Sequence, residues 1–159
     1  MAKLKFKGLE EYERQLMKLQ EVSRECVGKA IHDGAGVVAD AVKANIQSLP
    51  IDERHVKNGE MLNGISAAQK AGLIDGFGIA PLQDDGGYLN VKLGFAGYNS
   101  VKTRSYPNGQ PNSLIARSVN SGTSFRQRIP FVDNAVTANK AAAEQKMKDV
   151  FDKTLKSSL

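Results

Sequence analysis

Apolar residues recur at helical spacing near both ends of the chain. Residues about 8–22 predict an amphipathic helix with Leu9, Tyr12, Leu16 and Leu19 on one face. Residues Arg24 to Ser48 predict a second helix, which Pro50 ends. A third pattern follows Pro130, whose missing N–H suits the first turn of a helix. It predicts a helix of about 25 residues to the end of the chain, with an apolar face of Val132, Val136, Ala143, Met147, Val150, Phe151 and Leu155.

One side of the 24–48 helix is rich in small residues: Val27, Ile31, Gly34, Val38, Ala41 and Asn45. Gly28, Gly34 and Gly36 each weaken a helix by about 1 kcal/mol relative to alanine. Two interpretations stay open at this point. The glycines mark a local kink, or they allow the helix to pack closely against a sheet or another subunit.

The middle of the chain changes from helical to alternating periodicity. Residues 50–60 are polar and predict a loop, and residues 61–71 predict a short helical segment through Met61, Leu62, Ile65 and Ala68. Residues 73–80 and 88–96 predict an antiparallel pair of strands, the second with the clearest period-two alternation in the chain. Residues 83–87, Gln-Asp-Asp-Gly-Gly, predict the turn between them.

A loop and a short helix are predicted after the strands. Residues 97–111 are rich in Gly, Asn, Ser and Pro and predict a long exposed loop. Asn112 or Ser113 can cap a helix through about Asn120, with Leu114, Ile115 and Val119 buried. The order of two helices, a strand pair and two further helices predicts an α+β fold. In it, the N-terminal helices and the long C-terminal helix pack on a small antiparallel sheet.

Size and composition narrow the classes of protein. A length of 159 residues fits a single domain, residues 1–159, with long loops at about 97–111 and 122–129. No apolar run approaches the roughly 20 residues that cross a membrane, and the N-terminus lacks the apolar core of a signal peptide. The single cysteine, Cys26, cannot form an internal disulfide, which fits a reducing cytoplasm.

The charge and the aromatic content limit nucleic-acid binding. The net charge of +5 permits contact with an anionic surface but is low for a dedicated nucleic-acid binder. The chain has no tryptophan, and the low aromatic content of 6% argues against a platform for base stacking.

Residues that could carry chemistry are few and scattered. The candidates for a metal site are Cys26, His32 and His55; Cys26 and His32 are six residues apart, which does not place them on one helical face, and neither joins a second nearby ligand. His32 and Asp33 are adjacent and would point in different directions on a helix. The Gly76-Phe77-Gly78 stretch lacks the third glycine of a dinucleotide fingerprint. We therefore predict no catalytic, metal or cofactor-binding residue, and a protein that is not an enzyme.

Basic residues gather in the two long loops. Lys102 and Arg104 lie in the first loop, and Arg126 and Arg128 follow Thr123 in the second. Loop arginines can bind phosphates or carboxylates in a bidentate manner. Three roles stay open: a solvated surface, salt bridges between subunits, or contact with DNA. We expect Arg126 and Arg128 to be exposed, and we expect Pro130 and Phe131 to anchor the start of the last helix in the core.

The second basic loop and the helix after it resemble a known family. A Gly122-Thr123 step, a short loop, Pro130-Phe131 and an Ala/Lys-rich helix are similar to the ending of small tail-completion, or head–tail joining, proteins of long-tailed bacteriophages. The N-terminal helix that begins near residues 6–11 and the Ala/Val-rich helix after it are similar too. The chain departs from the pattern at Asn120-Ser121, where the family commonly has an acidic residue and an aromatic. It departs again at Asn134-Ala135, where Pro-Ala is common.

This resemblance implies a structural protein of the virion. Such a protein is a ring subunit at the head–tail junction, a homo-oligomer and often a hexamer, that meets other connector or tail proteins and has passing contact with DNA. It implies no cofactor and no membrane, with assembly in the host bacterial cytoplasm before incorporation into the tail or neck. Lys102, Arg104, Thr123, Arg126 and Arg128 are the residues expected at the subunit, ring or DNA contact. The alternative is a cytoplasmic nucleic-acid-binding module that uses the same basic loops.

Overall fold

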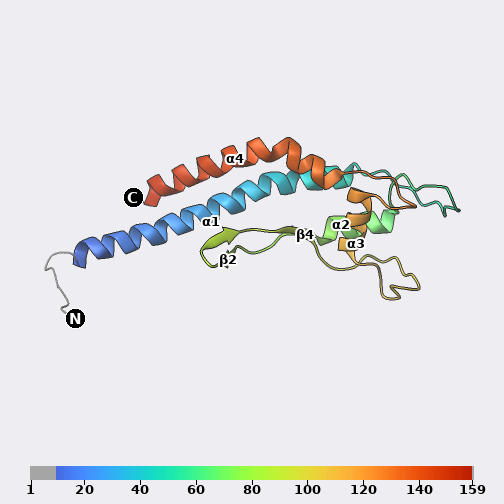
Figure 1. Ribbon diagram of the computed structural model, residues 1–159, viewed down its shortest axis with the longest axis horizontal. Helices are drawn as coiled ribbons and strands as arrows, with labels where there is room; N and C mark the ends of the chain where they lie inside the picture. Colours follow the sequence, from blue (N-terminus) through green and yellow to red (C-terminus); the bar gives the residue numbers. More distant parts are fainter. Residues whose placement is uncertain (1–9, 159) are drawn as a thin grey trace.

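The structure, a computed structural model, describes the backbone of residues 10–158 and the side chains of residues 14–158. These residues form an α+β fold, as predicted, with a long helix at each end and small antiparallel sheets between them (Figure 1). The elements in chain order are α1 Glu10–Gln47, α2 Ala67–Gly76, β1 Phe77–Ile79, β2 Gln83–Asp85, β3 Tyr88–Asn90, β4 Leu93–Phe95, α3 Asn112–Ser121 and α4 Phe131–Ser158.

The two helices predicted before Pro50 are one continuous helix. α1 spans 38 residues, because no proline or glycine between residues 10 and 27 interrupts its backbone hydrogen bonding. Leu16 and Leu19, two members of the apolar face predicted for its first part, share one side of this helix, but the described chain does not bury them. Leu16 and Leu19 are 47% and 46% exposed. Leu9 lies outside the described residues, and the side chain of Tyr12 lies outside those described.

α1 and α4 run alongside each other in opposite directions (Figure 1). The glycines of α1 account for part of this contact. A Cβ at Gly34 would lie 2.4 Å from Cγ of Met147 and 3.2 Å from the backbone oxygen of Ala143. Close packing is therefore the correct interpretation at Gly34, and the surface it packs on is a helix of the same chain. Gly36 faces open space.

The predicted strand pair is an interrupted antiparallel hairpin. β1 pairs with β4, and β2 pairs with β3 around a turn at Gly86 and Gly87. Both glycines have positive φ, 66° and 96°, the backbone conformation that two-residue hairpin turns favour. The predicted turn was too wide, because residues 83–85 are strand. The first predicted strand began too early, because residues 73–76 end α2.

The short helix predicted over 61–71 begins and ends later than expected, as α2. A capping box determines its start: the Ser66 side chain accepts from the Gln69 backbone N–H, and the Gln69 side chain accepts from the Ser66 N–H. Residues 61–66 are not helical. In α3, Ile115 and Val119 are buried as expected, but Leu114 is 39% exposed. Pro111, without a side-chain hydrogen bond, occupies the capping position expected for Asn112 or Ser113.

The buried core lies towards one end of the molecule, which we call the head. It contains the C-terminal part of α1 and the start of α4, together with α2, α3 and β1, and its members are Ala39, Val42, Ile46, Leu49, Ile65, Leu73, Phe77, Ile115, Ala116, Val119, Phe131 and Ala135. The other end, the arm, contains α1 up to Asp33, α4 from Ala143 and the β2–β3 tip (Figure 1). Its buried apolar side chains are small: Cys26, Ala30 and Ala143. The head is therefore a packed core, whereas the arm is a thin layer.

Candidate interaction surfaces

The second basic loop is held against the head by backbone hydrogen bonds. The N–H of Leu62 donates to the carbonyl of Phe125, and the N–H of Gln127 donates to the carbonyl of Leu62, each at 2.8 Å. The N–H of Thr123 donates to the carbonyl of Arg126 at 3.0 Å. The Thr123 side chain is half-buried and its hydroxyl accepts from the N–H of Phe125. The loop between α3 and α4 is thus an ordered segment, hydrogen-bonded to the backbone of Leu62.

Arg126 is buried, so the expectation that it is displayed is wrong. The residue is only 4% exposed, and its guanidinium donates to the carbonyl of Gly64. Burial lowers the pKa of this guanidinium, and Asp52 opposes that effect by attraction. The backbone of Arg126 pairs with the backbone of Leu62, and the Arg126 side chain is directed inward, toward Gly64. Arg126 therefore joins two segments of one chain and cannot meet DNA or a neighbouring subunit.

Arg128 is exposed, as expected, but it is already engaged. Its Nε donates to the carbonyl of Asn120 at 3.1 Å, and its Nη2 lies 3.3 Å from the Asp133 carboxylate. Asn120 has a structural role that the sequence did not predict: its side-chain oxygen accepts from the N–H groups of Val132 and Asp133 at 3.1 and 3.2 Å. It thereby caps the first turn of α4 from the end of α3, and a cap so distant in sequence has no local signature.

Pro130 and Phe131 hold the start of α4, as expected. Pro130 immediately precedes the helix and is half-buried, whereas Phe131 is 2% exposed. The Phe131 ring meets the Phe95 ring edge-on at 6.1 Å, and Phe95 in turn lies 5.0 Å from Phe77. The aromatic chain connects α4 to the hairpin and thereby fixes where the preceding loop runs.

The first basic loop, residues 97–111, is ordered at its base and exposed at its tip. Asn99 is buried, its N–H donates to the carbonyl of Gln110, and its side-chain oxygen accepts from the N–H of Val101. Lys102 and Arg104 are exposed, and neither has an ion pair with another described residue. Of the four basic loop residues, these two have charges that remain open to a partner.

A third loop at the same end of the head carries an ion pair that the sequence did not predict (Figure 1). Arg54 donates through Nε and Nη2 to the two oxygens of Asp52 at 2.8 and 2.7 Å. The Asn63 N–H donates to the same carboxylate at 2.9 Å. The Arg54 guanidinium and the Asn63 N–H hold the pKa of Asp52 well below its usual range. Asp52 thus closes the loop between α1 and α2.

The residues considered for chemistry do not come together. Cys26 is buried in the arm, His55 is exposed in the loop after α1, and His32 is exposed with Nδ1 3.7 Å from the Asp33 carboxylate. Within residues 10–158, no group of three or more His, Cys, Asp or Glu side chains could hold a metal ion. The absence of catalysis stays a prediction.

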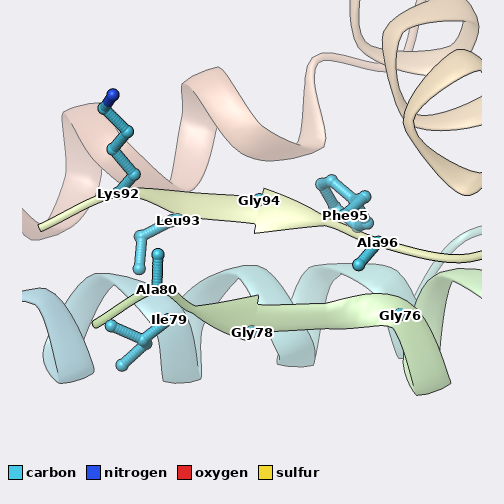
Figure 2. Close-up of a pocket in the computed structure, with 9 residues that line it drawn as sticks. All are labelled: Gly76, Gly78, Ile79, Ala80, Lys92, Leu93, Gly94, Phe95 and Ala96. Atoms are coloured by element: carbon cyan, nitrogen blue, oxygen red, sulfur yellow. The ribbon is translucent and has the colours of Figure 1, made fainter.

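A shallow depression of about 300 Å³ lies on the β1–β4 pair. Figure 2 shows its nine lining residues, among which Gly78 and Gly94 face each other across the two strands. A Cβ at either glycine would have no neighbour within 4 Å, so the face is open. Its lining is apolar or backbone except for Lys92, whose side chain extends away from the strands (Figure 2). The depression lacks the convergent polar groups of an active site.

The arm carries a more extensive apolar surface, which we call the arm groove. It consists of two hollows of about 500 and 480 Å³ that share Val27 and Ile31 of α1. Met147 and Phe151 of α4 line one hollow, and Tyr88 and Leu89 of the hairpin tip line the other. Tyr88 is 71% exposed, and the other five side chains are half-buried. Apolar surface of this kind is typical of an interaction site.

No family model, curated protein or solved structure matches this chain. In the part of the chain that the structure describes, no helix has the length and apolar character to cross a membrane.

Proposed function

We propose that this protein is a structural subunit of a phage virion, a ring subunit at the head–tail junction that completes or joins the tail. The observation that carries the proposal is the incomplete burial of the arm. Val27, Ile31 and Phe151 in the arm are only half-buried, whereas the apolar core residues of the head are buried. A subunit that leaves such a surface uncovered has a partner for it. The resemblance of residues 122–131 and of the helices to tail-completion proteins is the reason to propose the head–tail junction of a phage as the assembly.

The division into head and arm suits a closed assembly. When one surface of a subunit binds a different surface of the next copy, the contact is heterologous and produces a ring if the rotation closes. In this arrangement the arm meets neighbouring copies. The head loops, with Lys102 and Arg104 exposed, face another ring, a connector or tail protein, or DNA in passing.

The nucleic-acid-binding alternative has less support. Arg126 is internal and Arg128 is bound to Asp133 and Asn120, which removes two of its four basic loop residues. Lys102 and Arg104 alone make few phosphate contacts, and each contact contributes to affinity and to its salt dependence. Tight DNA binding that falls steeply with salt would favour this alternative over the virion role.

The location of the chain in particles tests the proposed function. Particles from the genome that encodes the chain are purified and probed with an antibody against it in the electron microscope. We expect label at the head–tail junction, and capsid and tail-tube genes on either side of the coding sequence. A chain that is abundant in infected cells but absent from particles would contradict the proposal.

A further inference from the structure

Three asparagine–glycine bonds lie in the loops of the head, and the fold holds them differently. They are Asn58–Gly59 and Asn63–Gly64 in the loop between α1 and α2, and Asn108–Gly109 in the loop after β4. At such a bond the backbone nitrogen of the glycine can attack the side-chain carbon Cγ of the asparagine, because glycine has no side chain to hinder the approach. This reaction makes asparagine one of the chemically labile residues of proteins.

We infer that Asn58 is a site of spontaneous deamidation in the folded protein, and that the fold protects Asn63 and Asn108. The inference is independent of the proposed function. In the first step the Gly59 nitrogen loses its proton and bonds to Cγ of Asn58, the bond from Cγ to the side-chain nitrogen breaks, and ammonia leaves. Water then opens the cyclic imide and leaves aspartate or isoaspartate at position 58.

Asn58–Gly59 occupies an exposed turn that few contacts hold closed. Both residues are exposed, and a Cβ at Gly59 would have no neighbour within 4 Å. The φ of Gly59 is 87°, and the Glu60 N–H donates to the Lys57 carbonyl at 3.0 Å, which is the pattern of a type II turn. The Lys57 N–H also donates to a carboxylate oxygen of Glu60 at 3.1 Å. The Gly59 N–H donates to no other described residue, so the attacking nitrogen is not engaged.

Asn63–Gly64 is held on both sides of the bond. The Asn63 N–H donates to the Asp52 carboxylate at 2.9 Å, and the Gly64 carbonyl accepts from the buried Arg126. Gly64 is buried, and the carbonyl of Pro50 occupies the place that a Cβ would take. Attack on the asparagine side chain needs the peptide between the two residues to rotate, and these contacts oppose that rotation.

Asn108–Gly109 is held through the glycine. Asn108 is exposed, but Gly109 is buried, and the backbone oxygen of Asn99 occupies the place of its Cβ. The Gly109 N–H donates to the Tyr106 carbonyl at 3.2 Å, and this hydrogen bond has to break before the nitrogen can lose its proton. The three sites therefore share a dipeptide and differ in how readily the surrounding backbone opens.

Deamidation changes the charge of one head loop. A carboxylate replaces a neutral amide next to Lys57, so the net charge of the chain falls by one, from +5 to +4. Isoaspartate also adds a methylene group to the backbone of the turn. An aged sample should therefore contain two charge forms that differ at this turn and that ion-exchange chromatography can separate.

Peptide mapping by mass spectrometry after timed incubation of the wild-type protein measures each site. Asn58 and Asn63 share the tryptic peptide 58–70, so fragmentation is needed to assign them. In the folded protein Asn58 is expected to deamidate at least about tenfold faster than Asn63 and Asn108, a difference of about 1.4 kcal/mol in activation free energy. The rate should rise with pH, because the attacking nitrogen must lose its proton. In concentrated urea the three rates should become similar, because the contacts that protect two of the sites are lost.

Two variants test the role of the turn. Asn58→Gln has a longer side chain that would have to close a larger ring, so modification at position 58 should disappear while Asn108 is unaffected. Glu60→Ala removes the side-chain hydrogen bond to Lys57 and should raise the rate at Asn58 by about two- to threefold. Urea unfolding midpoints of both variants should match wild type, because the substituted side chains are exposed.

Equal rates at the three sites in the folded protein would overturn the inference, and so would a slower reaction at Asn58 than at either other site. An Asn58 that reacts in urea but stays intact in the folded protein would show that the turn does not open, and the inference would be wrong. None of these outcomes bears on the proposed ring subunit, because the reaction needs only water and no partner.

Discussion

Buried side chains on both sides of Pro130 fix the course of the chain between α3 and α4. Arg126 faces inward to the carbonyl of Gly64, and Phe131 lies in the core beside Phe95. Between them, Arg128 points outward to Asp133. The segment 122–131 is therefore partly buried and connects α3 to α4, although its sequence is that of an exposed basic loop. Substitutions in it should affect folding to very different degrees.

Phe131→Ala should lower the free energy of unfolding by about 3–5 kcal/mol, because truncating a packed Phe leaves a cavity as well as losing burial. Phe131 is 2% exposed, whereas Phe125 in the same segment is 48% exposed. Phe125→Ala is thus the matched control and should cost much less. Urea unfolding of the dilute protein measures both. Equal midpoints for the two variants would mean that Phe131 is buried at an interface between subunits and not in the core of the monomer.

Arg126→Glu should lower the free energy of unfolding by about 3 kcal/mol or more. A carboxylate cannot donate to the Gly64 carbonyl, and it would place an uncompensated buried charge near Asp52. Arg128→Glu removes only a surface pair with Asp133, and it should cost under about 1 kcal/mol. Thermal or urea unfolding distinguishes them. If Arg126→Glu folds as stably as Arg128→Glu, the buried position of Arg126 is wrong.

At the scale of elements, the arrangement of α1 against α4 depends on glycine. Gly34 lets the two helices approach, because any side chain there would meet Met147 and the Ala143 carbonyl. Gly36, two residues further along the same helix, has open space where a Cβ would be. The two glycines share a helix and a residue type but differ in what surrounds them.

Alanine at these two positions should have opposite effects. Gly36→Ala should raise the free energy of unfolding by about 0.5–1 kcal/mol, the helix preference of alanine over glycine. Gly34→Ala gains the same preference but forces Met147 away from its contact, so it should destabilise the protein. Unfolding midpoints of the two variants measured side by side provide the check. Stabilisation by both would mean that α1 and α4 do not pack at Gly34.

Periodicity predicted the elements whose signals are local. The start of α4 at Pro130-Phe131, the pairing of strands around Gly86-Gly87 and the burial of Ile115 follow from spacing and turn chemistry. The length of α1 was not predicted, because the two apolar patterns were assigned to separate helices although no proline or glycine lies between residues 10 and 27. Leu16 and Leu19 on its first turns share one face, as predicted, and both are exposed.

The candidate site was only partly predictable for the same reason. The exposure of Lys102, Arg104 and Arg128 follows from loop composition. The burial of Arg126 depends on the carbonyl of Gly64, 62 residues away, and on pairing with Leu62. The arm groove is formed by side chains of α1, the hairpin tip and α4, so no single stretch of sequence marks it.

The molecule as a whole combines a packed head with a thinly covered arm, and this division supports the proposed assembly. The core cluster lies in the head, while the arm leaves its groove open and Leu16 and Leu19 exposed. We propose that these open surfaces close a ring of identical subunits.

Native mass spectrometry of the wild-type protein over a series of concentrations tests this claim most directly. We expect a single closed oligomer that grows at the expense of monomer and has one fixed number of subunits. Strict monomers at the highest concentration, or a ladder of open-ended sizes with no preferred one, would contradict it.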